Sequence, residues 1–119
     1  MQKNLDLQIE ALSLDRNYQI VKFNGEFDKA GHSEIREKLD TEVKSFEGTS
    51  LIFDFTNLKF INSEGIGYLM EIHAHLIKND KRLIIIGLQH NVKDVFETIG
   101  ISEIIPLYKN LDEFLSSKG

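Results

Sequence analysis

Two short apolar runs separated by a helical run constrain the fold of this chain more than any other feature. Residues 50–55 ("SLIFDF") have the composition of a central strand, and residues 82–88 ("RLIIIGL") are apolar without alternation, as in a strand covered on both faces of a parallel or mixed sheet. Between them, residues 63–78 place apolar side chains on one side of a helix at about 100° per residue. These side chains are Ile66, Leu69, Met70, Leu76 and Ile77. The pattern predicts a β-α-β unit.

The segment before this unit predicts a hairpin followed by a helix. Residues 4–12 alternate between apolar and polar side chains, and residues 18–24 form a second strand-like run after a polar turn. A helical period follows, with a helix of roughly 14 residues whose N-cap is either Asp28 or Ser33. Its apolar side is formed by Ile35, Leu39, Val43 and Phe46.

The segment after the unit predicts a helix, an edge strand and a short final helix. Residues 92–99 have helical spacing and are followed by Gly100, which favours a left-handed helix end. The run "EIIPLY" reads as a strand, and Pro106 places it at an edge because proline cannot donate to a strand ladder. The expected order is ββαβαβαβα, an α/β fold with an open mixed sheet of about five strands and about four helices.

Composition and charge narrow the function. The chain has 119 residues with 41% hydrophobic and 28% charged, which predicts one globular domain spanning residues 1–119. Its net charge of -5, without a Lys/Arg cluster, argues against nucleic acid or an anionic membrane as partner. The chain has no cysteine, no signal-peptide pattern and no run of about 20 apolar residues, so we expect a cytoplasmic protein.

The stretch "FINSEGIG", residues 60–67, is the leading candidate site. It is predicted to form a polar loop between the strand at 50–55 and the following helix, and open α/β sheets usually bind ligands at the carboxyl ends of their strands. Ser63 has two interpretations that local sequence leaves open. As a helix N-cap, its loss would cost about 1 kcal/mol. As a phosphoacceptor, it would gain about -1.5 to -2 charge at a helix N-terminus that tolerates anions.

Cofactor and metal chemistry are weakly supported. Gly65-x-Gly67-x-x-Met70 resembles a dinucleotide fingerprint, but Met70 replaces its third glycine and no acidic residue follows the next strand. His73 and His75 point about 200° apart on a helix and cannot share an ion. We therefore expect no cofactor and no metal.

Catalysis is also weakly supported. Asp54 could be the acceptor aspartate of a receiver domain, but that chemistry needs further acidic residues, and only Asp28 is available. No nucleophile elbow or convergent carboxylate pair stands out. We expect that the protein is not an enzyme.

The run "DFTNLKFINSEGIGYL" resembles the signature of STAS domains, in particular of bacterial anti-sigma factor antagonists. Nine residues match that signature in register: Asp54, Thr56, Leu58, Phe60, Ile61, Ser63, Gly65, Ile66 and Gly67. "GEFD" at residues 25–28 resembles the family's Gly-Glu-Leu-Asp before its first helix. Asn62 stands where the family usually has aspartate, and Glu64 where it usually has a second Ser or Thr.

The resemblance implies a switch protein that regulates transcription. In the antagonists, the serine of this motif is phosphorylated by the partner anti-sigma factor, a serine kinase of the histidine-kinase-like ATPase type, and a PP2C-type phosphatase reverses the modification. Carried over, this makes Ser63 the phosphoacceptor, with Asp28 near it. The unphosphorylated protein would sequester the anti-sigma factor and free a sigma factor. The alternative is a constitutive STAS adaptor in a signalling or transport assembly.

The same resemblance implies a partner-binding surface around the acceptor. Its residues are Asp28, Asn62, Ser63, Glu64, Gly65, Ile66 and Gly67.

Overall fold

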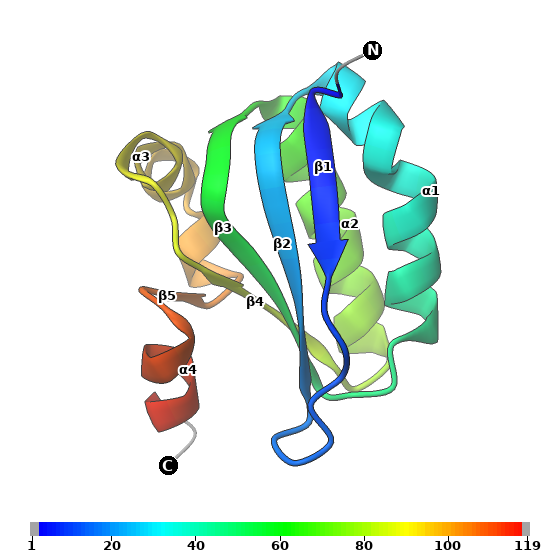
Figure 1. The fold of residues 1–119 in the computed structure, drawn as a ribbon. Helices are drawn as coiled ribbons and strands as arrows, with labels where there is room; N and C mark the ends of the chain where they lie inside the picture. The colour runs from blue at the N-terminus through cyan, green and yellow to red at the C-terminus, as the bar shows by residue number, and fades with distance from the viewer. Residues whose placement is uncertain (1–2, 118–119) are drawn as a thin grey trace.

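The computed structural model describes residues 3–117 and shows an open sheet with helices packed against it (Figure 1). The elements in chain order are β1 Leu5–Ile9, β2 Tyr18–Phe27, α1 Lys29–Ser45, β3 Ser50–Ile61, α2 Ser63–Lys78, β4 Arg82–Ile86, α3 His90–Ile99, a 3₁₀ turn Ile101–Glu103, β5 Leu107–Tyr108 and α4 Leu111–Ser117. This order confirms the predicted fold class, with the 3₁₀ turn as an addition.

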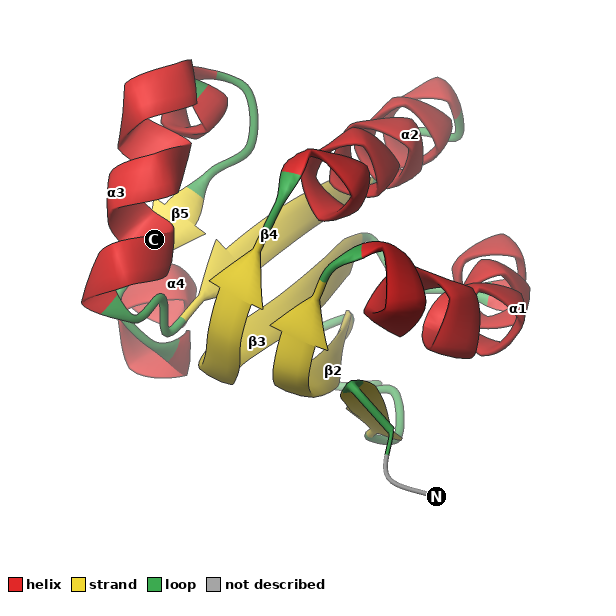
Figure 2. Ribbon diagram, turned by 90° about the horizontal axis from the view of Figure 1, so that it is seen from above, coloured by secondary structure: helices red, strands yellow, loops and turns green. Residues whose placement is uncertain are grey.

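The five strands lie in the sheet in the order of the chain. β1 pairs antiparallel with β2, which confirms the predicted hairpin. β2, β3, β4 and β5 are mutually parallel, and a helix joins each to the next, which confirms the β-α-β unit. In Figure 2, α1 and α2 lie along one face, while α3 and α4 gather at the end of the sheet where β5 lies.

Side-chain alternation along the strands builds two cores. The larger contains Phe23, Phe53 and Phe55 together with buried side chains of α1, α2 and α3. The smaller lies on the other face, where α4 covers part of the sheet. Its buried members are Ile20, Ile52, Ile84, Ile86 and Phe114. Both faces of β4 are therefore covered, which explains its unbroken apolar sequence.

β3 is longer than predicted, and the polar loop expected after residue 55 does not exist. The strand continues to Ile61, pairing with β2 as far as Phe27↔Ile61, whereas β4 accompanies it only as far as Asp54. Two register shifts between β2 and β3 interrupt the alternation, so the strand resembles a loop in sequence. Side-chain amides of the α3 region replace the missing partner strand: Gln89 donates to the Thr56 carbonyl oxygen at 2.8 Å, and Asn91 to that of Lys59 at 2.8 Å.

Three helix and strand details differ from the expectations. The predicted apolar side of α2 included Ile77, but Ile77 is 53% exposed, and Tyr68 and Ile72 join Leu69 and Leu76 on the buried side. α1 is 17 residues long rather than roughly 14. β5 has only two residues, because the chain forms the 3₁₀ turn before Pro106. No helix within residues 3–117 has the length and apolarity needed to cross a membrane.

Candidate functional site

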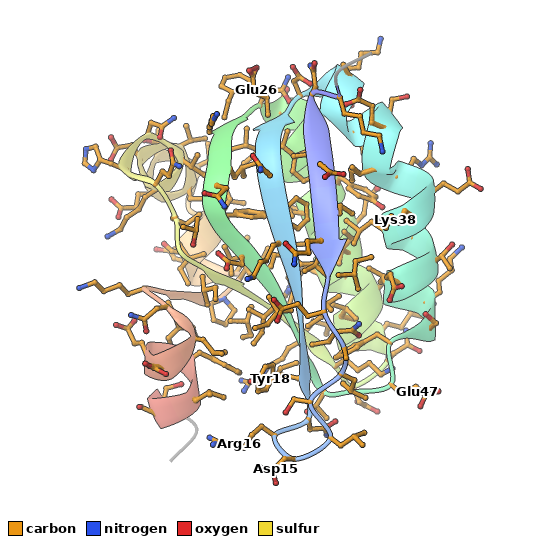
Figure 3. The ribbon with its side chains drawn as sticks, viewed as in Figure 1. Asp15, Arg16, Tyr18, Glu26, Lys38 and Glu47 are labelled. Atoms are coloured by element: carbon orange, nitrogen blue, oxygen red, sulfur yellow. The ribbon has the colours of Figure 1, made fainter. Side chains whose placement is uncertain are left out.

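The candidate site lies where α1 and α2 begin, at the carboxyl ends of β2 and β3. The strands end side by side at Phe27 and Ile61, and the next amide, that of Asn62, donates to the Phe27 carbonyl oxygen at 3.2 Å. Figure 3 marks this end of the sheet with Glu26, while Asp15 and Arg16 mark the hairpin loop at the opposite end. Asp28 and Asn62 are therefore neighbours, each immediately before a helix.

Asn62, not Ser63, is the N-cap of α2. Its Oδ1 accepts from the backbone N–H groups of Glu64 at 3.1 Å and Gly65 at 3.3 Å. The interpretation of Ser63 as the cap is therefore wrong. Asn and Ser are both strong N-caps, and periodicity defines a helix start only to within about one or two residues, so the sequence could not separate them.

Ser63 is the first residue of α2 and is exposed. Within the described part of the chain, its hydroxyl has no hydrogen-bond partner. The helix start is thus stabilised by one residue, and the next presents a free hydroxyl to solvent.

The two glycines of the motif have different surroundings. Gly65 is buried, and a Cβ there would lie 2.7 Å from both the Phe27 carbonyl oxygen and Ile61 Cγ1. Its place is therefore in the close packing of α2 on the sheet rather than on an exposed surface. Gly67 is exposed, and no atom lies within 4 Å of where its Cβ would be. Ile66 is half-buried against the larger core.

A shallow hollow of about 300 Å³ adjoins Ser63. Besides Ser63, it is lined by His32, Glu64, Gly67, Tyr68 and Glu71. No Lys or Arg is among these residues. The adjacent hollow shares His32 and Glu64 and adds Lys29 and Arg36, but it also contains Glu37 and Asp40, and Arg36 Nε is 3.7 Å from Asp40 Oδ2.

His32 and Tyr68 are members of this region that the motif did not reveal. Their rings lie 4.4 Å apart between centroids, and they join α1 to α2. The Tyr68 hydroxyl donates to Asp40 Oδ1, and burial together with this contact raises the pKa of Tyr68 far above its usual range. His32 Nε2 is buried and unpaired among the described residues. Little in the sequence indicates that His32 lies here, because His32 comes before the regularly spaced apolar residues of its helix.

Asp28 is the N-cap of α1, which settles the choice between Asp28 and Ser33. Its Oδ1 accepts from Gly31 N at 2.8 Å, and the Asn4 side-chain amide lies 3.3 Å from Oδ2. The bond from Gly31 is the main reason that the pKa of Asp28 is below its usual value. Asp28 is therefore a carboxylate at neutral pH. It follows Phe27, the last residue of β2, whose carbonyl oxygen accepts from the Asn62 N–H.

The other candidate residues lie apart from this region. Asp54 Oδ1 accepts from the backbone N–H and the hydroxyl of Thr56, at 2.9 and 2.6 Å, where the register between β2 and β3 shifts. His73 is half-buried with an unpaired, buried Nδ1, and His75 is exposed. In the portion of the chain that the structure describes, no three His, Asp or Glu side chains are grouped to hold a metal.

The STAS domain family model matches residues 8–114, and the chain belongs to this family. Two curated relatives are named anti-sigma-B factor antagonist. The one from Staphylococcus aureus is 28% identical over 101 residues, covering 85% of this chain and 92% of the relative. The one from Listeria monocytogenes is 28% identical over 109 residues, covering 91% and 93%.

Solved structures share the fold at lower identity. The anti-sigma factor antagonist SpoIIAA in its unphosphorylated form has a TM-score of 0.74 at 23% identity, covering 94% of this chain and 95% of that chain. The phosphorylated form of SpoIIAA from Bacillus has a TM-score of 0.68 at 22% identity, covering 96% and 100%. An anti-sigma factor antagonist from Mycobacterium paratuberculosis has a TM-score of 0.74 at 18% identity, covering 95% and 92%.

Proposed function

We propose that this protein is an anti-sigma factor antagonist that is switched by phosphorylation of Ser63. It acts by binding rather than by catalysis, in the cytoplasm, and its partner is an anti-sigma factor that is also a serine kinase of the histidine-kinase-like ATPase type. A PP2C-type phosphatase restores the binding form. The names of the curated relatives support the regulatory role. The observation that carries the switch is the exposed Ser63 hydroxyl beside a cap made by another residue.

The surroundings of Ser63 indicate how a phosphoryl group would act. The N–H groups of Glu64 and Gly65 already donate to Asn62. The adjoining hollow offers Glu64 and Glu71 rather than Lys or Arg. A phosphate adding about -1.5 to -2 charge therefore has no strong partner within the hollow. The phosphate instead points toward an approaching partner protein. There it repels the partner's carboxylates, or it must lose its water against an apolar surface of the partner, which costs free energy. Binding is therefore lost without any refolding of this chain.

The partner-binding surface is proposed to be the exposed part of the motif. Asn62, Ser63, Glu64 and Gly67 supply its accessible atoms, with Asp28 beside them and Ile66 at its margin. Gly65 contributes by bringing α2 close to β2 and β3. Asn62 keeps the hydrogen-bonding capacity of the aspartate usual in the family, and the structure shows that this capacity is used for capping.

The partner kinase is first recovered from an extract of the native cell with immobilised Ser63→Ala protein. The test then compares how tightly the Ser63→Glu and Ser63→Ala proteins bind this kinase. We expect Ser63→Ala to bind as well as the parent and Ser63→Glu to bind at least tenfold more weakly in calorimetry, a difference of about 1.4 kcal/mol. Ser102→Glu, at another exposed serine, is the matched control for charge and should bind normally.

Equal binding by Ser63→Glu and Ser63→Ala would contradict the switch and favour the constitutive adaptor. Intact-mass measurement gives an independent result. The native protein should carry a species about 80 Da heavier, the mass of one phosphoryl group, which is absent from Ser63→Ala.

A further inference from the structure

A second candidate site lies far along the chain from Ser63, at the carboxyl ends of β4 and β5. A cavity of about 490 Å³ opens there between α3 and α4. It is lined by Leu88, Lys93, Leu107, Tyr108, Lys109 and Glu113. Its volume falls within the range of about 300–1,000 Å³ typical of small-molecule sites.

The topology explains why a crevice forms at this place. β4 and β5 are parallel neighbours, but the chain leaves them in different directions. β4 leads into α3, whose Val92 and Phe96 enter the larger core, whereas β5 leads into α4, whose Phe114 enters the core on the other face. Adjacent parallel strands whose exits diverge to opposite faces leave a crevice at their carboxyl ends, which is where open α/β sheets bind ligands. Figure 1 shows α3 and α4 on either side of β5.

The lining combines an apolar wall with cationic side chains. Leu88, Leu107 and Tyr108 are half-buried, and the Tyr108 ring is fixed by an edge contact with Phe114 at 5.4 Å. No hydrogen bond of the Tyr108 hydroxyl is found within residues 3–117. The Gly87 N–H, just beyond the end of β4, donates to the Tyr108 carbonyl oxygen at 3.3 Å.

The charges in the lining favour an anion. Glu113, the only carboxylate among the described lining residues, is engaged in the start of α4: its Oε1 accepts from Lys109 N at 3.1 Å, while its own N–H donates to Asn110 Oδ1 at 2.9 Å. Lys93 has only an exposed ion pair with Glu97 at 3.8 Å, which is worth little. The Lys109 ammonium group has no ion pair among the described residues. Two ammonium groups are thus available in a chain of net charge -5.

We propose that this crevice binds a small organic carboxylate with a compact apolar body. The carboxylate pairs with Lys109 and Lys93, and the apolar body packs against Leu88 and Leu107, which lie on the face of the larger core. The site is separate from the Ser63 surface, so a test of one proposal does not decide the other.

The experiment is a two-dimensional ¹H–¹⁵N NMR titration of the full chain with benzoate, and with benzamide as its neutral counterpart. We expect saturable shifts with benzoate at the amides of residues 87–89, 93 and 107–109, and much weaker ones with benzamide. Lys109→Gln and Lys93→Gln should each weaken benzoate binding about fivefold, as expected for a partly exposed charged contact. Lys38→Gln, on α1, is the matched control and should bind as the parent does.

The proposal would be overturned by benzoate shifts that do not saturate, by equal shifts with benzamide, or by unchanged affinity in both lysine variants. The spectra also report whether each variant is folded, so a loss of binding is not confused with unfolding. Saturable shifts at Ser63 instead of the crevice would also overturn it.

Discussion

At the scale of the residue, helix capping and the exposed hydroxyl of the site belong to different residues. Asn62 accepts the two N–H groups at the start of α2, and the Ser63 hydroxyl is left free. The sequence placed both residues in the motif and left the cap open as one of two interpretations of Ser63. The cap is Asn62, and the sequence could not show this because the capping preferences of Asn and Ser are nearly equal. The side chains that join α1 to α2, His32 and Tyr68, were missed, because contacts between helices are not encoded in a local pattern.

The first prediction compares Asn62→Ala with Ser63→Ala. We expect Asn62→Ala to lower the free energy of unfolding by about 1 kcal/mol, because two helix N–H groups lose their acceptor. Ser63→Ala should change it by less than about 0.5 kcal/mol, as for an ordinary surface substitution. Urea denaturation followed by circular dichroism measures both. A loss in Ser63→Ala as large as that in Asn62→Ala would show that Ser63 is the true cap.

At the scale of the element, α2 depends on one glycine and tolerates replacement of the other. Gly65 faces the Phe27 carbonyl oxygen, and Gly67 faces open space. The sequence presents them as an equivalent Gly-Ile-Gly pair, since spacing cannot show which one meets the sheet. Periodicity predicted the presence of α2 correctly but misplaced Ile77, because the edge of a helix's buried face depends on the neighbouring helix and strand.

The second prediction compares Gly65→Ala with Gly67→Ala. Gly65→Ala should destabilise the protein by about 1–3 kcal/mol, because the new methyl group meets the Phe27 carbonyl oxygen and the buried side chains of Ile61 and Phe27. Gly67→Ala should stabilise it by about 0.5–1 kcal/mol through helix propensity. Thermal denaturation of the two variants beside the parent measures the opposite signs. Shifts of the same sign would contradict the packing described for Gly65.

At the scale of the whole molecule, the sheet is covered unequally on its two faces. The larger core takes side chains from three helices, while the smaller core depends on α4. The order of elements along the chain and the mixed sheet followed from the β-α-β pattern and the opening hairpin, whereas the order of the strands within the sheet was not predicted. The length of β3 could not be predicted, because the register shifts hide the alternation of its side chains. The crevice at the ends of β4 and β5 could not be predicted either, because it depends on which face of the sheet α4 covers.

The third prediction concerns the smaller core. Phe114 is fully buried, so Phe114→Ala should lower the free energy of unfolding by about 3–5 kcal/mol. Phe60→Ala removes the same atoms from a side chain that is 45% exposed and should cost about 1 kcal/mol or less. Urea denaturation measures both changes. A cost for Phe114→Ala no greater than that for Phe60→Ala would show that α4 contributes little to the fold.

Asn62 caps α2 and Ser63 presents a free hydroxyl, and this separation has an evolutionary consequence. Because the cap belongs to one codon and the free hydroxyl to the next, we expect a mutation that removes Ser63 to leave a chain that folds and accumulates like its parent. Protein quality control, which recognises unfolded chains, does not detect such a loss. Under the switch proposed above, selection maintains Ser63 only through its phosphorylation, and lineages can gain or lose that switch in one step without first repairing the fold.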